Sequence, residues 1–224
     1  SVSDAEVSIS RVRGFGYGLS APSISGLNVG SAIGSTIASD VTIEDYFFYG
    51  NVGTMGAGGG LIGRIGGTGS NEGTGEISVS RVAIYAGVET DDNPNVDYTP
   101  ASGDSTQVGG LFGDVANENG MVTVNGAAIY VHLNSASGAP SGSFGWLAGQ
   151  IGGKVLFDDV FIGREDDLYN ETDASRDESN VVCRYASGGF NTQVIMSDVV
   201  FNIREAGGAS KLDELTSTSS CIQD

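Results

Sequence analysis

Carboxylates are the side chains with the greatest capacity for chemistry in this sequence, and they gather in two polar stretches, residues 89–107 and 164–180. In proteins, Ca²⁺ is coordinated by oxygen ligands such as these carboxylates. In the second stretch the candidate calcium ligands are Asp166, Asp167, Asp173 and Asp177. Neither stretch has the spacing of an EF-hand loop or of the Gly- and Asp-rich calcium nonapeptide. We therefore interpret both as solvated loops, and Ca²⁺ is the one cofactor that stays open as an alternative.

Groups that commonly catalyse reactions are scarce. His132 is the only histidine, and the sequence contains no Gly-x-Ser-x-Gly, His-Glu-x-x-His or phosphate-binding loop. A pair of carboxylates could act as in glycosidases, but acidic residues are so numerous that their presence does not favour that function. No cluster of basic residues offers the base that a polysaccharide lyase needs. We predict that the chain is not an enzyme; a solenoid carbohydrate-active enzyme is the least favoured alternative.

Two cysteines, Cys183 and Cys221, lack the Cys-x-x-Cys or Cys/His spacing of a zinc site. We predict that they form a disulfide, because a free thiol in the polar tail around Cys221 would be exposed and reactive. Two buried free thiols are the alternative. A disulfide persists outside the reducing cytosol, so this prediction places the protein extracellularly or at the cell surface. A cleaved secretion signal would explain the start at Ser1, and a trimmed sequence would explain it equally well.

The composition indicates an acidic all-β protein. With 28 acidic and 10 basic residues the net charge is −18, and such a surface repels nucleic acid and anionic membranes. No apolar run is long enough to span a bilayer. We therefore predict neither nucleic-acid binding nor membrane insertion. The 36 glycines, together with many β-branched residues, predict short strands separated by turns.

One ten-residue pattern occurs six times. The copies read EVSISRVRGF from Glu6, DVTIEDYFFY from Asp40, EISVSRVAIY from Glu76, MVTVNGAAIY from Met121, KVLFDDVFIG from Lys154 and QVIMSDVVFN from Gln193. The first two apolar positions are two residues apart, as on one face of a strand. The third comes three residues later. This extra residue predicts a bend or bulge at the mostly small, polar doublet that precedes the third apolar position.

A second, glycine-rich pattern precedes several copies. It reads GGLIG over residues 59–63 and GGLFG over 109–113, and weaker forms are FGWLAG over 144–149, VGSAIG over 29–34 and GGF over 188–190. The flanking glycines let the backbone turn tightly around an inward apolar side chain. GGLIG followed by GEISVSRVAIYAGV, and GGLFG followed by GMVTVNGAAIYVHL, resemble the GLUG repeat of bacterial surface and secreted proteins. The resemblance covers about residues 29–203. It implies a β-solenoid, a secreted or cell-surface setting and no catalytic residue.

Stacking of the copies predicts an all-β fold, a right-handed β-solenoid of about six coils over residues 1–205 with a C-terminal capping tail over 206–224. One coil cannot bury its apolar face alone, so three buried columns are expected. The first contains Val7, Ile9, Val41, Ile43, Ile77, Val79, Val122, Val124, Val155, Phe157, Val194 and Met196. The second contains Val12, Tyr46, Val82, Ala127, Val160 and Val199, and the third contains Phe48, Ile84, Ile129, Ile162 and Phe201.

Aromatic residues recur near the ends of the strand patterns; they are Tyr17, Tyr46, Phe47, Phe48, Tyr49, Tyr85, Tyr130 and Trp146. We expect most of them to cap the apolar columns, whereas exposed ones would stack on sugars or contact a partner subunit. The favoured function is an extracellular, surface-presented, adhesin-like structural or binding module that recognises a glycan or a protein. A structural subunit of a pilus, filament or viral fibre, associating through the solenoid ends, is the first alternative.

Overall fold

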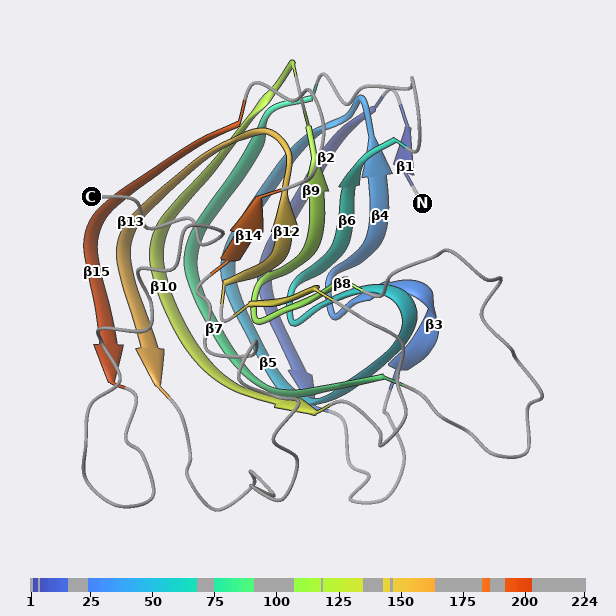
Figure 1. Cartoon of the computed structure of the whole chain (residues 1–224), viewed down its shortest axis with the longest axis vertical. Coiled ribbons are helices and arrows are strands. Elements are labelled where there is room, and N and C mark those ends of the chain that lie inside the picture. The colour runs from blue at the N-terminus through green and yellow to red at the C-terminus, as the bar shows by residue number, and fades with distance from the viewer. Residues whose placement is uncertain are drawn as a thin grey trace.

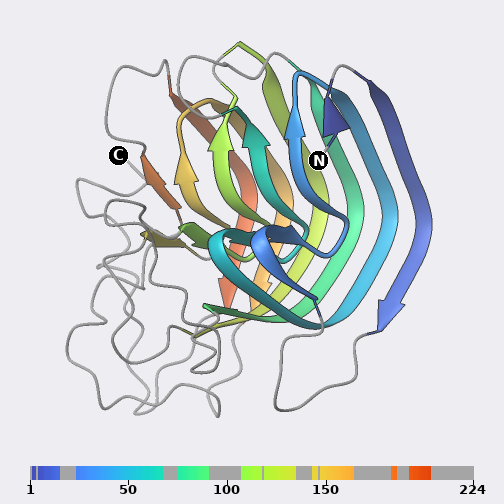
Figure 2. The ribbon, with the colours of Figure 1, turned by 90° about the vertical axis from the view of Figure 1, so that its right-hand side faces the viewer.

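A computed structural model describes residues 2–3, 5–15, 24–67, 75–90, 107–117, 119–134, 143–145, 147–163, 183–185 and 192–202 of the chain. These residues form strands β1 to β15 and no helix. All pairings between the strands are parallel, and they build two sheets that face each other (Figures 1 and 2). The prediction of an all-β fold is therefore confirmed.

The larger sheet is built mainly from the six predicted patterns. Its long strands are β2 (Glu6–Phe15), β5 (Asp40–Gly59), β7 (Ile77–Thr90), β10 (Met121–Asn134), β13 (Lys154–Gly163) and β15 (Gln193–Asn202). Three further strands, β3 (Ile24–Gly30), β8 (Gln107–Gly109) and β11 (Ser143–Gly145), join the same sheet. β3 and β8 pair with the second half of β5.

The second sheet consists of six short strands, and several of them follow a glycine-rich turn. It runs in the order β1 (Val2–Ser3), β4 (Ile33–Ile37), β6 (Ile62–Gly66), β9 (Phe112–Ala116), β12 (Ala148–Ile151) and β14 (Cys183–Tyr185). The GGF at residues 188–190 lies outside the described residues. The strand that pairs with β12 is instead Cys183–Tyr185, with Ala148 beside Cys183.

The strand register matches the alignment of the six copies residue for residue. Ile43 lies beside Ile9 on one side and Val79 on the other, and Val124 lies between Val79 and Phe157. The parallel register brings equivalent apolar positions of successive copies together, because side chains on one strand face repeat every second residue. Sequence segments 33 to 45 residues apart thereby become neighbours.

The bend predicted within each pattern is present in all six copies. The second residue of each doublet has a positive φ; these residues are Arg11 (57°), Asp45 (52°), Arg81 (50°), Gly126 (74°), Asp159 (51°) and Asp198 (50°). We refer to these six residues as the corner ladder. A left-handed conformation at a non-glycine residue costs about 1 kcal/mol or more. The long strands turn at this point, which lets apolar side chains on both sides of the bend enter one core.

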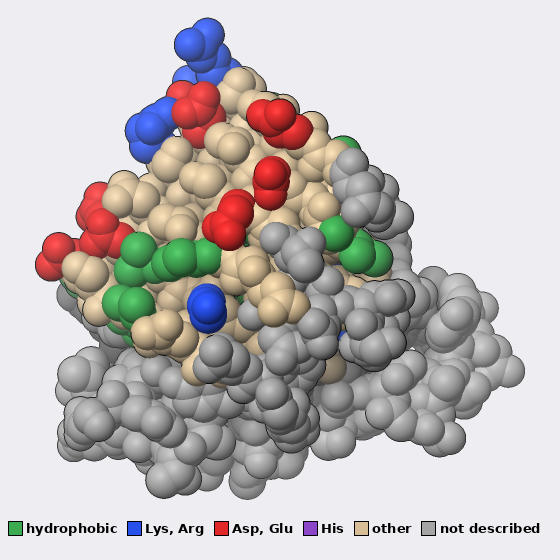
Figure 3. Space-filling view, turned by 90° about the horizontal axis from the view of Figure 1, so that it is seen from above, with side chains coloured by type: hydrophobic (Ala, Val, Ile, Leu, Met, Phe, Trp, Pro, Cys, Tyr) green, Lys and Arg blue, Asp and Glu red, His purple; other side chains and the backbone are tan. Residues whose placement is uncertain are grey.

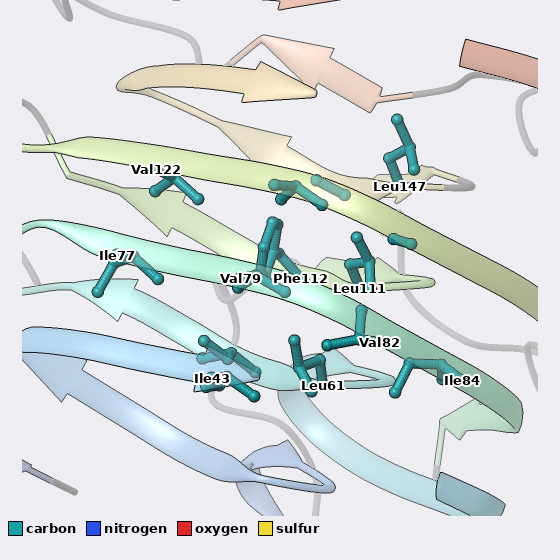
Figure 4. Close-up of a cluster of buried hydrophobic side chains, with 14 of the residues drawn as sticks. Ile43, Leu61, Ile77, Val79, Val82, Ile84, Leu111, Phe112, Val122 and Leu147 are labelled. Carbon is teal, nitrogen blue, oxygen red and sulfur yellow. The ribbon is translucent and has the colours of Figure 1, made fainter. Parts of the chain in front are cut away.

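The core between the two sheets contains the predicted columns of the four inner copies. Every column member in β5, β7, β10 and β13 is buried, from Val41 in β5 to Ile162 in β13, and Figure 4 shows several of them pointing toward the facing sheet. The end copies differ. Val7, Ile9, Val194, Met196 and Val199 are only partly buried. Val12 is 37% exposed, so its assignment to a buried column is wrong, because β2 pairs only with β5 among the described strands. The side chain of Phe201 is not among those described.

The glycine-rich turns supply the remaining core side chains. Leu61, Leu111 and Leu147 are fully buried (Figure 4). The Leu111 carbonyl accepts hydrogen bonds from the N–H groups of Leu61 and Ile62, both at 3.0 Å, and the turns of neighbouring copies repeat this arrangement. A Cβ at Gly59 would clash with the carbonyl oxygens of Ile62 and Leu111. Glycine is therefore required because two backbones meet there.

Candidate functional site

The outer face of the large sheet carries a row of aromatic side chains. Because side chains alternate between the two faces of a strand, Phe47 and Tyr49 point outward while Tyr46 and Phe48 of the same strand enter the core. The register places Tyr49, Tyr85 and Tyr130 side by side on β5, β7 and β10. We call this row the aromatic stripe; its members are Phe15, Phe47, Tyr49, Tyr85, Tyr130 and Phe161.

The rings of the aromatic stripe contact one another across the strands. The centroids of Tyr49 and Tyr85 are 5.0 Å apart with nearly parallel rings, 18° between planes. The Tyr85–Tyr130 and Tyr130–Phe161 distances are 5.9 and 5.6 Å. Tyr130 and Phe161 are tilted by 50°, so neither ring covers the whole face of the other. Each such pair stabilises the sheet by about 0.5–1.5 kcal/mol beyond the area it buries.

Much of the aromatic stripe remains open to solvent. Phe15 is 56% exposed, and Tyr49 and Tyr130 are each 44% exposed. Tyr130 lies against the backbone of Gly163, where an added Cβ would come within 2.6 Å of its ring. The expectation that most of the aromatic residues cap the apolar columns is therefore wrong for the described ones: Tyr46 and Phe48 are buried, whereas Phe47, Tyr49, Tyr85 and Tyr130 face outward. Tyr17 and Trp146 lie outside the described residues.

Small and charged side chains border the aromatic stripe. Ala83 and Ala128 occupy the equivalent outward positions of β7 and β10, between Phe47 and Phe161, and no long side chain of these two strands fills the interval. The corner ladder runs along one side of this region, two residues before the Phe47 position. Hydrogen-bonding groups thus lie next to exposed apolar rings.

Arg81 is the best-connected member of the corner ladder. Its Nε donates to Asp45 Oδ1 at 2.7 Å, and its Nη2 donates to Glu44 Oε2 at 2.9 Å. The hydrogen bond from Arg81 lowers the pKa of Asp45, and the bonds to Asp45 and then Glu44 raise the pKa of Arg81. Asn125 Nδ2 donates to Asp158 Oδ2 at 2.9 Å beside the same ladder. The ion pair between Arg81 and Asp45 therefore favours the charged forms of both side chains.

The residues predicted from sequence to bind calcium or to form the disulfide are not assembled by the described part of the chain. Asp166, Asp167, Asp173, Asp177 and Cys221 lie outside the described residues. Cys183 is the first residue of β14, and its side chain is not described. Within the described ranges, no group of three or more His, Cys, Asp or Glu side chains could hold a metal ion. The disulfide and the calcium site both stay predictions.

A buried ion pair was not predicted. Arg64 Nη2 of β6 lies 3.0 Å from Asp114 Oδ2 of β9, with side-chain exposures of 21% and 9%. Arg64 also donates to the Gly67 carbonyl at 3.2 Å. Burial raises the pKa of Asp114, and the Arg64 guanidinium partly offsets that rise. The signal was available in the sequence, because the two residues follow GGLIG and GGLFG directly and therefore occupy equivalent positions in adjacent copies.

No family model, curated protein or solved structure matches this chain. Among the described residues, no helix of the length and apolar character needed to cross a membrane occurs. The aromatic stripe with its polar border is the strongest candidate site that the described surface offers.

Proposed function

We propose that this chain is a non-catalytic, adhesin-like binding module of the GLUG-repeat type, presented outside the cell, and that its aromatic stripe binds neutral glycans. The single observation that carries the proposal is the outward placement of two groups of contacting rings, Phe15–Phe47 and Tyr49–Tyr85–Tyr130–Phe161, in which Phe15, Tyr49 and Tyr130 are exposed. These rings point away from the core of the protein. Exposed apolar patches on a folded protein are typical of binding surfaces.

The architecture that we propose for the module is a right-handed β-solenoid of six coils. Six copies of one strand pattern lie parallel and in register, and a short strand of the facing sheet follows five of the six long strands along the chain. Parallel neighbours in one sheet need crossover connections, and these are right-handed in nearly all proteins. A chain wound this way repeats one outward position once per coil, which is how a row of rings arises.

A neutral glycan is the ligand class that fits the composition of the site. Sugar rings offer C–H faces to aromatic side chains and hydroxyl groups to charged and phenolic neighbours. Tyr85 and Tyr130 supply the rings, and Arg81 with Asp45 supplies hydrogen-bonding groups at the border. The net charge of −18 disfavours sulfated or uronic-acid polymers and nucleic acid. The extracellular setting rests on the predicted disulfide and on the resemblance to surface proteins.

Binding to an array of neutral glycans, followed by calorimetry with the best ligand, tests the proposal. Tyr130→Ser should weaken binding roughly tenfold, since loss of one stacked ring removes about 1.4 kcal/mol. Thr123→Ala changes an outward residue of the same strand away from the aromatic stripe and should leave affinity unchanged. The proposal fails if the folded parent binds no glycan on the array, or if Tyr130→Ser and Thr123→Ala bind equally well.

A further inference from the structure

In the described part of the chain, the two ends of the large sheet are open strand edges; the predicted capping tail, residues 206–224, lies outside the described residues. β2 pairs only with β5, and β15 pairs only with β13. Core positions that are fully buried in the inner copies are more exposed here: Val12 of β2 is 37% exposed, and Val194, Met196 and Val199 of β15 are only partly buried. On the outer face of β15, Ile195 and Val200 are 45% and 55% exposed. An unpaired strand edge beside apolar side chains is a template for a further strand.

The two edges fit each other because both carry the same ten-residue pattern. β15 lies beside β13 in the register that all neighbouring copies share. In that same register, β2 of a second copy would lie beside β15 and continue the buried columns, with Val7 next to Val194, Ile9 next to Met196 and Val12 next to Val199. Each new neighbour would cover apolar area that the isolated chain leaves partly exposed.

The charges at the two edges are also complementary. Inside the chain, corner Arg81 reaches back to corner Asp45 of the preceding strand at 2.7 Å. Arg11 is the corner residue of β2, and Asp198 is the corner residue of β15, with Asp159 before it. Arg11 of a second copy would therefore approach Asp198 with the same polarity. Among the described residues, neither Arg11 nor Asp198 has an ion-pair partner within 4.0 Å.

Figure 3 shows this asymmetry on the surface seen from above. Basic side chains gather mainly at the top of this view, with acidic side chains next to them, and a further group of acidic side chains lies at the left edge beside hydrophobic ones. The end that bears β2 contributes Arg11 and Arg13, and the end that bears β15 contributes Asp158, Asp159 and Asp198. A surface with opposite charges at its two ends favours contact between unlike ends.

We propose that a second copy of this chain docks its β2 edge onto the β15 edge, parallel and in register, with Arg11 paired to Asp198. The contact is head-to-tail, so each added copy leaves one free edge, and association continues into an open filament unless the rotation between copies closes a ring. The aromatic stripe would then repeat along the assembly. This inference concerns a second surface and does not rest on glycan binding.

Charge reversal at either edge tests the proposal with little risk to the fold. Arg11→Asp and Asp198→Arg place at each corner a residue type that another corner already holds at a positive φ, as Asp45 and Arg81 do. Each variant alone would bring like charges together at the contact. At about physiological ionic strength, self-association measured by sedimentation and light scattering should weaken roughly tenfold in each.

Mixing the two variants gives the sharpest result. In an equimolar mixture, the aspartate introduced by Arg11→Asp meets the arginine introduced by Asp198→Arg, and the unaltered Asp198 and Arg11 meet at the next contact. Association should therefore return to within about twofold of the parent, and electron microscopy should show elongated particles. Circular dichroism of each variant before mixing establishes that both are folded.

A control variant distinguishes an effect of net charge on association from an effect of the contact between Arg11 and Asp198. Asp198→Arg and Glu76→Arg both reduce the net charge from −18 to −16, and Glu76 is an exposed residue in the middle of the stack. Weaker repulsion alone would make both variants associate more strongly than the parent, whereas the proposal predicts weaker association for Asp198→Arg only. A parent that stays monomeric at all concentrations, single variants that associate like the parent, or a mixture without recovery would each overturn the proposal.

Discussion

Removing Arg64 is the perturbation whose energetic effect follows most directly from the structure. Its guanidinium lies 3.0 Å from the Asp114 carboxylate, which is only 9% exposed. In the variant Arg64→Met the methylene stem is largely kept, and the charge that compensates Asp114 is lost. The Asp114 carboxylate would then be buried without a cation beside it.

Breaking a buried ion pair in this way typically costs 3–5 kcal/mol. Because Arg64 is itself 21% exposed, water reaches the pair, and we expect a smaller loss of about 2–4 kcal/mol at neutral pH. The double variant Arg64→Met/Asp114→Leu removes both charges and should come within about 1 kcal/mol of the parent. The ion pair therefore adds little net stability relative to two apolar residues, but each of its charges offsets the cost of burying the other.

The loss should depend on pH with a defined sign. Burial already raises the pKa of Asp114 above its usual 3.8, and removing Arg64 raises it further. An acid whose folded pKa is raised takes up a proton more readily when folded, so its destabilising effect grows as pH rises from about 3.8 through the folded pKa. Arg64→Met should thus lose more stability relative to the parent at about pH 8 than at about pH 5.

Denaturant unfolding of the parent, Arg64→Met and the double variant at both pH values measures these differences. Two results would show that Arg64 does not stabilise the protein by compensating the Asp114 charge. One is a loss below about 1 kcal/mol for Arg64→Met at about pH 8. The other is a double variant that is as unstable as the single one, which would show that lost packing rather than an uncompensated charge is responsible.

The core, the turns and the tail each give a further prediction. Val79→Asp should cost several kcal/mol because it buries an unpaired charge, whereas Ser78→Asp on the outward side should change the free energy of unfolding by under about 0.5 kcal/mol; equal melting of the two would mean that the strand register is wrong. Gly59→Ala should prevent folding or lower the melting temperature strongly, since its Cβ would meet two backbone carbonyls, and a variant melting like the parent would contradict that geometry. Cys183 and Cys221 should resist alkylation until reductant is added, as intact-mass spectrometry would report, and two alkylated thiols without reductant would remove the disulfide.

The strand register could be predicted from sequence because it depends on a local pattern repeated six times. Two apolar positions, a polar doublet and a third apolar position determine which residues enter the core and where the chain bends. The exposure of Val12 could not be predicted in this way, since the same position is buried in Tyr46 and Val82. What differs is the presence of a neighbouring strand on both sides, which is a property of the stack and not of the pattern.

The candidate site was predictable only in part. Alternation within DYFFY shows that two of its aromatic residues must face outward, but ring contacts between Tyr49, Tyr85 and Tyr130 require the register of three separate copies. The ion pair of Arg64 and Asp114 depends on the same cross-copy register. By contrast, the acidic stretch at 164–180 lies outside the described residues, so its calcium ligands stay a prediction.

The most direct test of glycan binding by the aromatic stripe is an NMR titration of the parent protein with the neutral oligosaccharide that binds best on the array. We expect the largest shifts in the ring resonances of Tyr49, Tyr85, Tyr130 and Phe161 and in the backbone amides of Ala83 and Ala128. The rings of Tyr46 and Phe48, buried on the opposite side of the same sheet, serve as internal controls and should shift little. Shifts that cluster away from the aromatic stripe, or equally large shifts in the buried rings, would contradict glycan binding at the aromatic stripe.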